Sequence, residues 1–357
     1  MKVLSIVGAR PQFIKAAPVD KVLRSDGHEH ILLHTGQHYD YGMSKVFFDE
    51  LDIPEPDINL EIGSDSHARQ TGKMLIGVEE VIIREMPDWV LVYGDTNSTL
   101  AGALAAVKLN HPLAHVEAGL RSFNRQMPEE HNRVLTDHCS TLLFCPSRTA
   151  VDNLTREGIS SGVHLVGDVM YDAVLHIGSV ARLQSTILKR LDLTPKSYLV
   201  VTIHRPYNTD NPQNLHTILE AFNQIDETII FPVHPRTQKR INEFGLNNHL
   251  AEIHNLITIP PVSYLDMLML EQNAHFIVTD SGGMQKEAYF LGVPCLTLRP
   301  ETEWVETIEN GWNRLVERKP NALRQALESI NIPSSRPPVY GEGNASHQIA
   351  HILKESK

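Results

Sequence analysis

The stretch VTDSGGMQKEA, residues 278–288, decides the fold class because it joins a strand pattern to a helical pattern through two glycines. The apolar run 276–278 suits a buried strand, and apolar residues then recur at helical spacing over 284–291. Gly282 and Gly283 therefore lie where backbone N–H groups and the positive end of a helix dipole face outward, which favours an anion such as phosphate. The alternative is that the glycines only permit a tight turn, and this stretch alone does not choose.

The same alternation of short apolar runs with longer helical patterns extends along the whole chain. It is typical of an α/β protein with parallel sheets covered on both faces. Candidate strands begin at Val3, Ile31, Trp89, Leu113, Leu142, His164, Tyr198, Thr228, Leu256, Phe276 and Cys295.

At 357 residues the chain suits two domains. We predict an N-terminal domain over 1–168 and a C-terminal domain over 169–345, which opens with a long helical stretch over 169–191. A last helix, 346–354, could return to the first domain. No internal repeat or low-complexity tract interrupts this organisation.

Composition narrows the class of partner. The 32 Lys+Arg against 43 Asp+Glu give a formal net charge of -11, which argues against a nucleic acid or an anionic membrane surface. Three cysteines without paired spacing predict reduced thiols and a cytoplasmic protein. The apolar run at the N-terminus is too short for a signal peptide, and no stretch reaches transmembrane length.

Polar side chains follow the predicted strands of both halves. Ligands of doubly wound sheets bind outside the carboxyl ends of the strands, so we expect one cleft between the halves to hold the chemistry. The residues at these positions are Arg10, Asp95, His115, Glu117, His204, His234 and Ser281.

Several of these positions allow two interpretations. Arg10 and Lys15 in GARPQFIK oppose the dipole of the helix they begin, which favours a diphosphate contact over surface charge. Asp95 in YGDTNST is either a functional carboxylate or part of a helix cap. Glu117 in HVEAGLRS is either a general base or a partner for Arg121.

Two further motifs also remain open. In MPEEHNR, Pro128 and the acids after it suit a helix start, and Glu129 can pair with Arg133, so spacing alone favours a structural role. His204 in TIHRPYN can titrate near neutrality and serve as an acid or a phosphate donor, or simply bond its loop.

Two patterns argue against bound cofactors. His28, His30, His34 and His38 are crowded together, but they straddle a glycine turn and lack a completing ligand, so we predict no metal there. No G-x-G-x-x-G opens a helix, which makes a bound nicotinamide cofactor improbable.

Seven motifs together resemble the non-hydrolysing UDP-N-acetylglucosamine 2-epimerases. GARPQFIK, the Gly-Asp-Thr of YGDTNST, HVEAGLRS, PEEHNR, the His-Arg of TIHRPYN, PVHP and TDSGGMQKEA occur in the family's order and approximate spacing. The resemblance implies the glycosyltransferase-B fold, in which two Rossmann-like domains close over a UDP-sugar. It also implies no metal, no bound NAD and a homodimer.

The resemblance further implies roles for individual residues. The family breaks the C2–H bond while UDP leaves C1, and UDP then adds back to an enzyme-bound 2-acetamidoglucal. Acid/base roles fall on Asp95, Glu117 and Glu129, positioned by Arg133 and Lys15, with His204 assisting UDP departure. Substrate contacts fall on Arg10, His234, Ser281, Gly282, Gly283 and, at the ribose, Glu287.

Two departures leave the sugar open. The family's TERPE reads Thr302-Glu303-Trp304-Val305-Glu306, and QEE reads Gln285-Lys286-Glu287. Both changes are similar to the branch that epimerises UDP-2,3-diacetamido-2,3-dideoxyglucuronate. Lys286 could meet a uronate carboxylate, although a solvated lysine is the simpler interpretation. A glycosyltransferase of the same fold is the further alternative.

Overall fold

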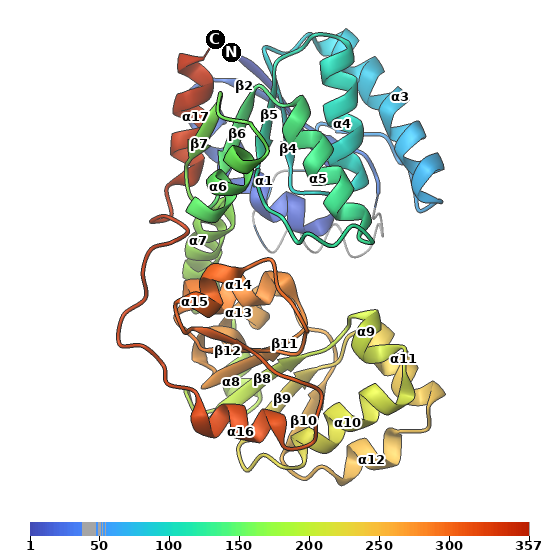
Figure 1. Ribbon diagram of the computed structural model, residues 1–357, viewed down its shortest axis with the longest axis vertical. Coiled ribbons are helices and arrows are strands. Elements are labelled where there is room, and N and C mark those ends of the chain that lie inside the picture. Colours follow the sequence, from blue (N-terminus) through green and yellow to red (C-terminus); the bar gives the residue numbers. More distant parts are fainter. Residues whose placement is uncertain (38–47, 49–50, 52, 54, 357) are drawn as a thin grey trace. The chain divides into compact units, whose positions relative to one another are not determined.

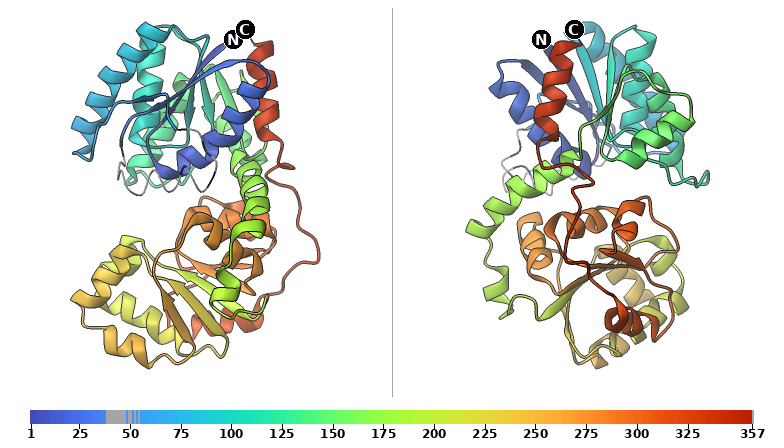
Figure 2. Two further views of the ribbon diagram at one scale, coloured as in Figure 1. Left: turned by 180° about the vertical axis from the view of Figure 1, so that it is seen from behind. Right: turned by 60° about the vertical axis from the view of Figure 1, so that its left-hand side comes forward.

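The computed structural model describes residues 1–37, 48, 51, 53 and 55–356. The chain divides into two compact units, Met1–His176 with Pro338–Lys357, and Ile177–Pro337. Each unit is a parallel sheet with helices on its faces (Figures 1 and 2). The α/β fold class expected from the alternating pattern is therefore confirmed.

The sheet of the first unit has seven strands within the described residues, in the order β3-β2-β1-β4-β5-β6-β7. Its paired strands are all parallel. The strands are β1 (Lys2–Val7), β2 (Glu29–His34), β3 (Ile58–Asn59), β4 (Trp89–Tyr93), β5 (Leu113–Val116), β6 (Leu142–Cys145) and β7 (Val163–Leu165).

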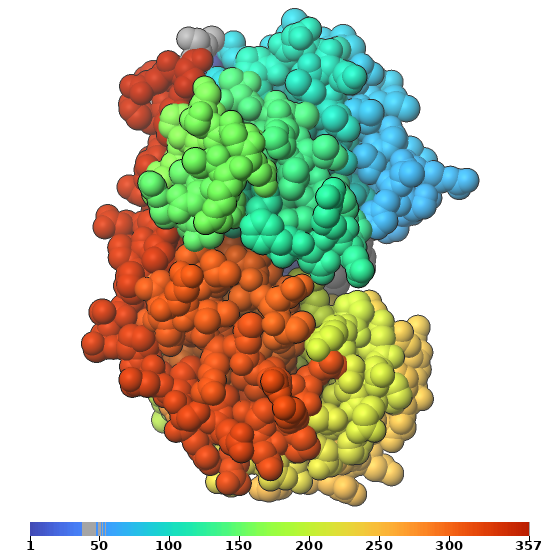
Figure 3. Space-filling view, in the orientation of Figure 1, coloured from blue at the N-terminus to red at the C-terminus, as the bar shows by residue number. Residues whose placement is uncertain are grey.

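The helices of the first unit cover both faces of this sheet (Figure 1). Those in the described part of the unit are α1 (Arg10–Ser25), α3 (His67–Glu85), α4 (Asn97–Lys108), α5 (Pro128–Cys139), α6 (Arg148–Arg156), α7 (Val169–Gln184, whose later part extends beyond the unit) and α17 (Ala345–Glu355). Helix α3 forms an outer edge of the unit in the space-filling view (Figure 3). Its residues Ile76 and Ile83 are exposed.

The sheet of the second unit has six strands in the order β10-β9-β8-β11-β12-β13. They are β8 (Tyr198–Thr202), β9 (Thr228–Pro232), β10 (Leu256–Ile259), β11 (Phe276–Thr279), β12 (Cys295–Thr297) and β13 (Asn313–Leu315). Along β8, Leu199 and Val201 enter one apolar cluster while Tyr198 and Val200 enter another. Alternate side chains thus feed cores on both faces, as a sheet covered on both sides requires.

The helices of the second unit are short. They are α8 (Ile187–Arg190), α9 (Pro206–Thr209), α10 (Pro212–Phe222), α11 (Pro235–Glu243), α12 (Asn247–Glu252), α13 (Tyr264–Asn273), α14 (Gly282–Leu291), α15 (Val305–Glu309) and α16 (Ala322–Ser329). The helical stretch predicted over 169–191 is in fact interrupted between α7 and α8, where the backbone of Thr186 is not helical.

Sequence patterning missed the two edge strands β3 and β13. Each has only two or three residues and neither is fully buried, so neither shows the continuous apolar run that marks a central strand. All of the strands that were predicted are present, and each begins within two residues of its predicted start.

The C-terminal helix α17 belongs to the first unit and packs on α1. The indole Nε1 of Trp89 donates to the carbonyl of Leu353 at 3.1 Å. At the other end of the helix, the buried carboxylate of Asp172 accepts from the amides of Ala345 and Ser346. No helix in the described part of the chain is both long enough and apolar enough to cross a membrane.

Candidate active site

Asp95 follows β4 and forms an ion pair with Arg133 of α5. Its backbone carbonyl accepts from Nδ2 of Asn132 at 2.9 Å, so the same helix holds both ends of the residue. Burial raises the pKa of the Asp95 carboxyl, and nearby Glu117 adds to this, while Arg133 and Lys15 oppose it. Of the two interpretations of Asp95, the helix-cap role is wrong, because Thr96 is the N-cap of α4 and its hydroxyl accepts from the amide of Thr99.

Glu117 lies at the end of the neighbouring strand β5, in a left-handed backbone conformation with φ of 73°. Such a conformation is uncommon for a residue with a side chain and is often found at functional sites. The buried carboxylate accepts from Nζ of Lys15 on α1. Arg121, its predicted alternative partner, instead binds Asp137 and Glu157, each at 2.7 Å.

Gly94 allows these groups to converge. A Cβ at this glycine would lie 3.3 Å from Oε2 of Glu117 and 3.5 Å from Nζ of Lys15, and the glycine φ is 62°. The ends of β4 and β5 therefore bring together two carboxylates, each paired with a cation from a helix. Such a pair of carboxylates in a shared charged environment can exchange protons with a bound molecule.

Glu129 is exposed in the first turn of α5. Its expected pairing with Arg133 is wrong, because that guanidinium meets Asp95 and lies 3.3 Å from Glu130. The buried carboxylate of Glu130 also accepts from the amides of Ser122 and Phe123, each at 2.9 Å. Glu130 therefore fixes the loop before α5, while Glu129 leaves its carboxylate at the surface.

His115 has a structural environment rather than a catalytic one. Its Nδ1 lies 2.7 Å from Oδ1 of Asp137 and its Nε2 lies 2.8 Å from the carbonyl of Gly94. Burial alone would raise the pKa of Asp137, but His115 and Arg121 outweigh it and lower that pKa. The fully buried imidazole thus stabilises the turn at Gly94, the residue before Asp95.

Arg10 is the first residue of α1 and is exposed. Two amides just before this helix, those of Gly8 and Ala9, donate to Oε1 of Gln12 at 2.8 and 3.1 Å. The helix start is therefore satisfied internally by Gln12, which sequence reasoning did not single out.

In the second unit, Ser281 caps α14, and its hydroxyl accepts from the amide of Met284 at 3.5 Å. Gly282 is buried beneath Glu303 and Trp304, whose Oε1 and Nε1 would lie 2.7 and 3.3 Å from an added Cβ. Gly283 is exposed, and its added Cβ would meet nothing nearer than Oγ of Ser281 at 3.7 Å. A side chain at the first glycine would therefore have to displace the Glu303 carboxylate, whereas the second leaves backbone open to a ligand.

Asp280 organises this turn, and the sequence analysis passed over it. The fully buried carboxylate accepts from the amides of His204 and Arg205 and from Nδ2 of Asn208, at 2.9 to 3.1 Å. It therefore fastens the loop after β8 to the end of β11, two strands that are neighbours in the sheet.

His204 and His234 lie beside this turn with ring centroids 5.4 Å apart. Burial lowers the pKa of His204, and His234 and Arg205 add to this while Asp280 opposes it. Burial also lowers the pKa of His234, whose Nδ1 accepts from the amide of Arg236 at 3.2 Å and so caps α11. Both imidazoles are therefore held toward the neutral form, in which one ring nitrogen donates.

Glu287 is buried one turn further along α14 and accepts from the hydroxyl of Tyr264 at 2.5 Å. Burial and the neighbouring carboxylate of Glu287 raise the pKa of Glu271 well above its usual value.

Lys286 is not solvated, which corrects the simpler interpretation of the sequence. It is only 2% exposed, and its Nζ lies 4.1 Å from the ring centroid of Trp304, which is itself buried. The two residues that depart from the common family pattern therefore contact each other as a cation and an aromatic face.

Among the described histidines of this stretch, His28, His30 and His34 form no group of potential metal ligands. His30 sits between Asp20 and Ser5, at 2.5 and 2.8 Å from its two ring nitrogens. Burial lowers the pKa of His34 to about 4. His38 lies outside the described residues.

Known proteins match this chain over nearly its whole length. The sequence model of the family described as UDP-N-acetylglucosamine 2-epimerase matches residues 21–354. A Methanococcus maripaludis UDP-N-acetylglucosamine 2-epimerase homolog is 55% identical over 99% of both chains. A Pseudomonas aeruginosa UDP-2,3-diacetamido-2,3-dideoxy-D-glucuronate 2-epimerase is 46% identical over 99% of both chains.

A solved structure matches as well. The Methanocaldococcus jannaschii UDP-GlcNAc 2-epimerase, crystallised with UDP-GlcNAc and UDP, has a TM-score of 0.90 and 45% identity, covering 99% of this chain and 100% of that chain. A Rickettsia africae glycosyltransferase, at 15% identity and a TM-score of 0.61, shares only the fold.

The two parallel-sheet units, with ionisable groups following their strands, define an α/β enzyme of the glycosyltransferase-B type. Within that class, the chain belongs to the UDP-N-acetylglucosamine 2-epimerase family and is an isomerase.

Proposed function

We propose that the protein inverts C2 of a UDP-linked 2-acetamido sugar, of the UDP-GlcNAc to UDP-ManNAc type, for cell-surface polysaccharide synthesis. The reaction proceeds by elimination of UDP to a 2-acetamidoglucal and by re-addition of UDP after the proton returns to the other face. The observation that carries this proposal is the convergence of Asp95 and Glu117, each with its own cation, at the ends of β4 and β5.

The chemistry explains why carboxylates and cations are needed together. The C2 hydrogen has no neighbouring carbonyl to acidify it, so the departing diphosphate must drive cleavage of the C–H bond. A carboxylate can take that proton, and a second acid/base group on the other sugar face can return it. We assign these exchanges to Asp95, Glu117 and Glu129, with Lys15 and Arg133 fixing the protonation and orientation of the first two.

The second unit supplies groups suited to a leaving UDP. The exposed backbone at Gly283 begins an α-helix, where amides and the helix dipole favour an anion. The neutral imidazoles of His204 and His234 beside it can each donate one hydrogen bond to a phosphate oxygen. Arg10 of the first unit adds a cation for the same diphosphate.

A pocket of about 430 Å³ lies in the second unit between Tyr207, Leu298 and Lys319. Its volume is large enough for a nucleoside. The guanidinium of Arg318 stacks on Tyr207 at 3.7 Å from the ring centroid. The pocket is tied to the phosphate turn through Asn208, which donates to the carbonyl of Leu298 and to Asp280. We propose this pocket as a place for the uracil base, and Glu287 stays the residue proposed for the ribose.

The diacetamido uronate is the second candidate substrate. The Pseudomonas relative that acts on it is 46% identical, and the Lys286–Trp304 contact lies directly beside Gly282. We propose Lys286, which lies over the Trp304 ring, as the residue that would meet the uronate carboxylate.

Incubation with UDP-GlcNAc in deuterated water tests the reaction. We expect deuterium at C2 in both recovered UDP-sugars, without an acceptor and without net release of UDP. Parallel reactions with UDP-ManNAc and the diacetamido uronate identify the preferred sugar. Sugar transfer only when an acceptor is added, with no deuterium at C2, would instead establish a glycosyltransferase.

A further inference from the structure

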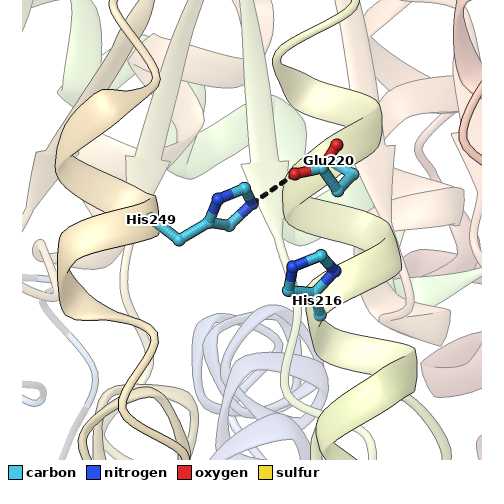
Figure 4. A group of neighbouring side chains, drawn as sticks. All are labelled: His216, Glu220 and His249. Atoms are coloured by element: carbon cyan, nitrogen blue, oxygen red, sulfur yellow. Dashed lines mark ion pairs between the residues drawn. The ribbon is translucent and has the colours of Figure 1, made fainter.

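Three potential metal ligands meet on the second unit, away from the turn at Ser281. His216 and Glu220 lie on α10, and His249 lies on α12. Their nearest ligand atoms all fall within 4.8 Å of one another. Among the described residues, no other three potential metal ligands come together in this way. Figure 4 shows the three side chains projecting from the two helices toward each other.

The spacing on α10 suits chelation. Residues four apart in a helix lie on the same face, so His216 and Glu220 present an imidazole and a carboxylate side by side. The exposed fraction of the Glu220 side chain is 36% and that of His249 is 20%, so the group is accessible to an ion from solvent without being fully solvated.

An ion pair alone does not account for the arrangement. His249 Nε2 lies 3.0 Å from Oε1 of Glu220, yet this buried nitrogen makes no hydrogen bond of good geometry. The ring of His216 stacks on that of His249 at 4.7 Å, tilted by 11°, and brings a second imidazole to a carboxylate that already has one. Two imidazoles and one carboxylate are a ligand set that zinc commonly takes.

We propose that His216, Glu220 and His249 bind a divalent transition-metal ion of the zinc type, with water completing the coordination. Ligand atoms around tetrahedral zinc are roughly 3.4 Å apart and an imidazole binds the ion in its ring plane, so one of the two stacked rings must turn out of the stack for both to bind. The ion would cross-link α12 to α10. Helix α12 has six residues and none is fully buried, so such a link would supply anchoring that packing provides only partly.

This site is independent of the proposed reaction, in which the ion takes no part. Its two helices hold none of the residues assigned to the substrate, and therefore the site can be tested without reference to epimerase activity.

Titration of the tag-free full chain with Co²⁺ tests the proposal, because Co²⁺ in a site of low coordination number absorbs visible light. We expect one Co²⁺ per chain and loss of the band when Zn²⁺ is added. His249→Ala and Glu220→Gln should each weaken binding at least about tenfold, a loss that even indirect changes cause at metal sites.

Two control variants separate this site from ordinary histidine–carboxylate pairs. His275 pairs with Glu227 at 2.8 Å, and His351 pairs with Glu355 at 3.3 Å with the same i,i+4 spacing on α17. Neither pair has a third ligand among the described residues. His275→Ala and His351→Ala should therefore bind Co²⁺ as the wild type does.

A measurement on the wild type covers variants that fold poorly. Zn²⁺ added to protein labelled with ¹⁵N-histidine should first shift the ring signals of His216 and His249. Absence of the Co²⁺ band, unchanged affinity in folded His249→Ala, or first shifts at other histidines would each overturn the proposal and leave the group as an ion pair with a stacked ring.

Discussion

The two units place charge differently at the carboxyl ends of their strands. In the first unit, Asp95 and Glu117 are each paired with a side-chain cation. In the second, the buried Asp280 is satisfied by amides, and Gly283 leaves the start of a helix open. The first arrangement holds ionisable groups that can exchange protons, and the second offers a helix start suited to an anion, the diphosphate in the function we propose.

The contrast teaches how one α/β plan serves two tasks. Side-chain charges can change protonation during a reaction, whereas backbone amides and a helix dipole cannot. Changes to the first unit should therefore alter kcat and its dependence on pH, and changes to the second should alter UDP affinity.

Glu117→Gln should have the largest effect. It keeps the shape and the contact with Lys15 but cannot accept a proton, so kcat should fall by about 10² to 10⁴-fold, as expected for a lost acid/base group. Glu85→Gln is a matched control, because Glu85 also pairs with a lysine of the first unit, Lys2, at 3.0 Å. Steady-state kinetics on both variants should show a loss only for the first, and near-normal kcat for Glu117→Gln would contradict the assignment.

Arg133→Met should shift the acid limb of the kcat profile. Burial already raises the pKa of Asp95 and Arg133 opposes this, so removing the cation raises that pKa further. The ionised Asp95 carboxylate is the form we propose to be active. As the pH is lowered, the variant should therefore lose activity at a higher pH than the wild type does. We therefore expect the midpoint of the acid limb to move to higher pH, measured from pH–rate profiles.

Arg148→Met is the control for that profile. Arg148 pairs with Asp152 on the exposed surface of α6, at 3.3 Å, and its removal should leave the limb in place. An unshifted limb in Arg133→Met would show that Asp95 does not govern the rate.

Substitutions at Gly282 and Gly283, in the turn after Ser281, should separate an effect on stability from an effect on UDP binding. Gly283→Ala has room in the free protein, so the melting temperature should hold while UDP affinity falls about tenfold, or ~1.4 kcal/mol. Gly282→Ala must displace the Glu303 carboxylate and should lower the free energy of unfolding by about 1 kcal/mol. Calorimetric titration with UDP and thermal melts measure both. Unchanged UDP affinity in Gly283→Ala would place the diphosphate elsewhere.

Lys286→Met should have the smallest effect. Loss of the cation above Trp304 should reduce stability by about 0.5 to 2 kcal/mol and leave kcat on UDP-GlcNAc within roughly twofold. The exposed Lys239 of α11 supplies the control, Lys239→Met. A selective loss of activity on the diacetamido uronate would instead show that Lys286 meets the substrate carboxylate.

Periodicity predicted most of the fold because central parallel strands are continuous apolar runs. It failed at β3 and β13, where short edge strands carry polar residues, and at Thr186, where a helical pattern continues through a break. These features depend on tertiary pairing and backbone geometry, which local sequence does not encode.

The site was predictable by position but not by pairing. Polar residues after strands identified Asp95, Glu117 and His204, since the carboxyl ends of parallel strands collect functional groups. The ion-pair partners were not predictable. Glu117 pairs with Lys15 and not with Arg121, and Arg133 pairs with Asp95 and not with Glu129. Ion pairs between distant segments follow the packing of helices on the sheet, and buried Asp280 shows the same dependence.

Breakage of the anomeric C–O bond is the central claim, and positional isotope exchange tests it directly. UDP-GlcNAc carries ¹⁸O in the oxygen that bridges C1 and the β-phosphate, and the recovered substrate is examined by ³¹P NMR. We predict that the label spreads to non-bridging β-phosphate positions as epimerisation proceeds, because released UDP can rotate before it adds back. Epimerisation with the label still wholly in the bridge would contradict elimination.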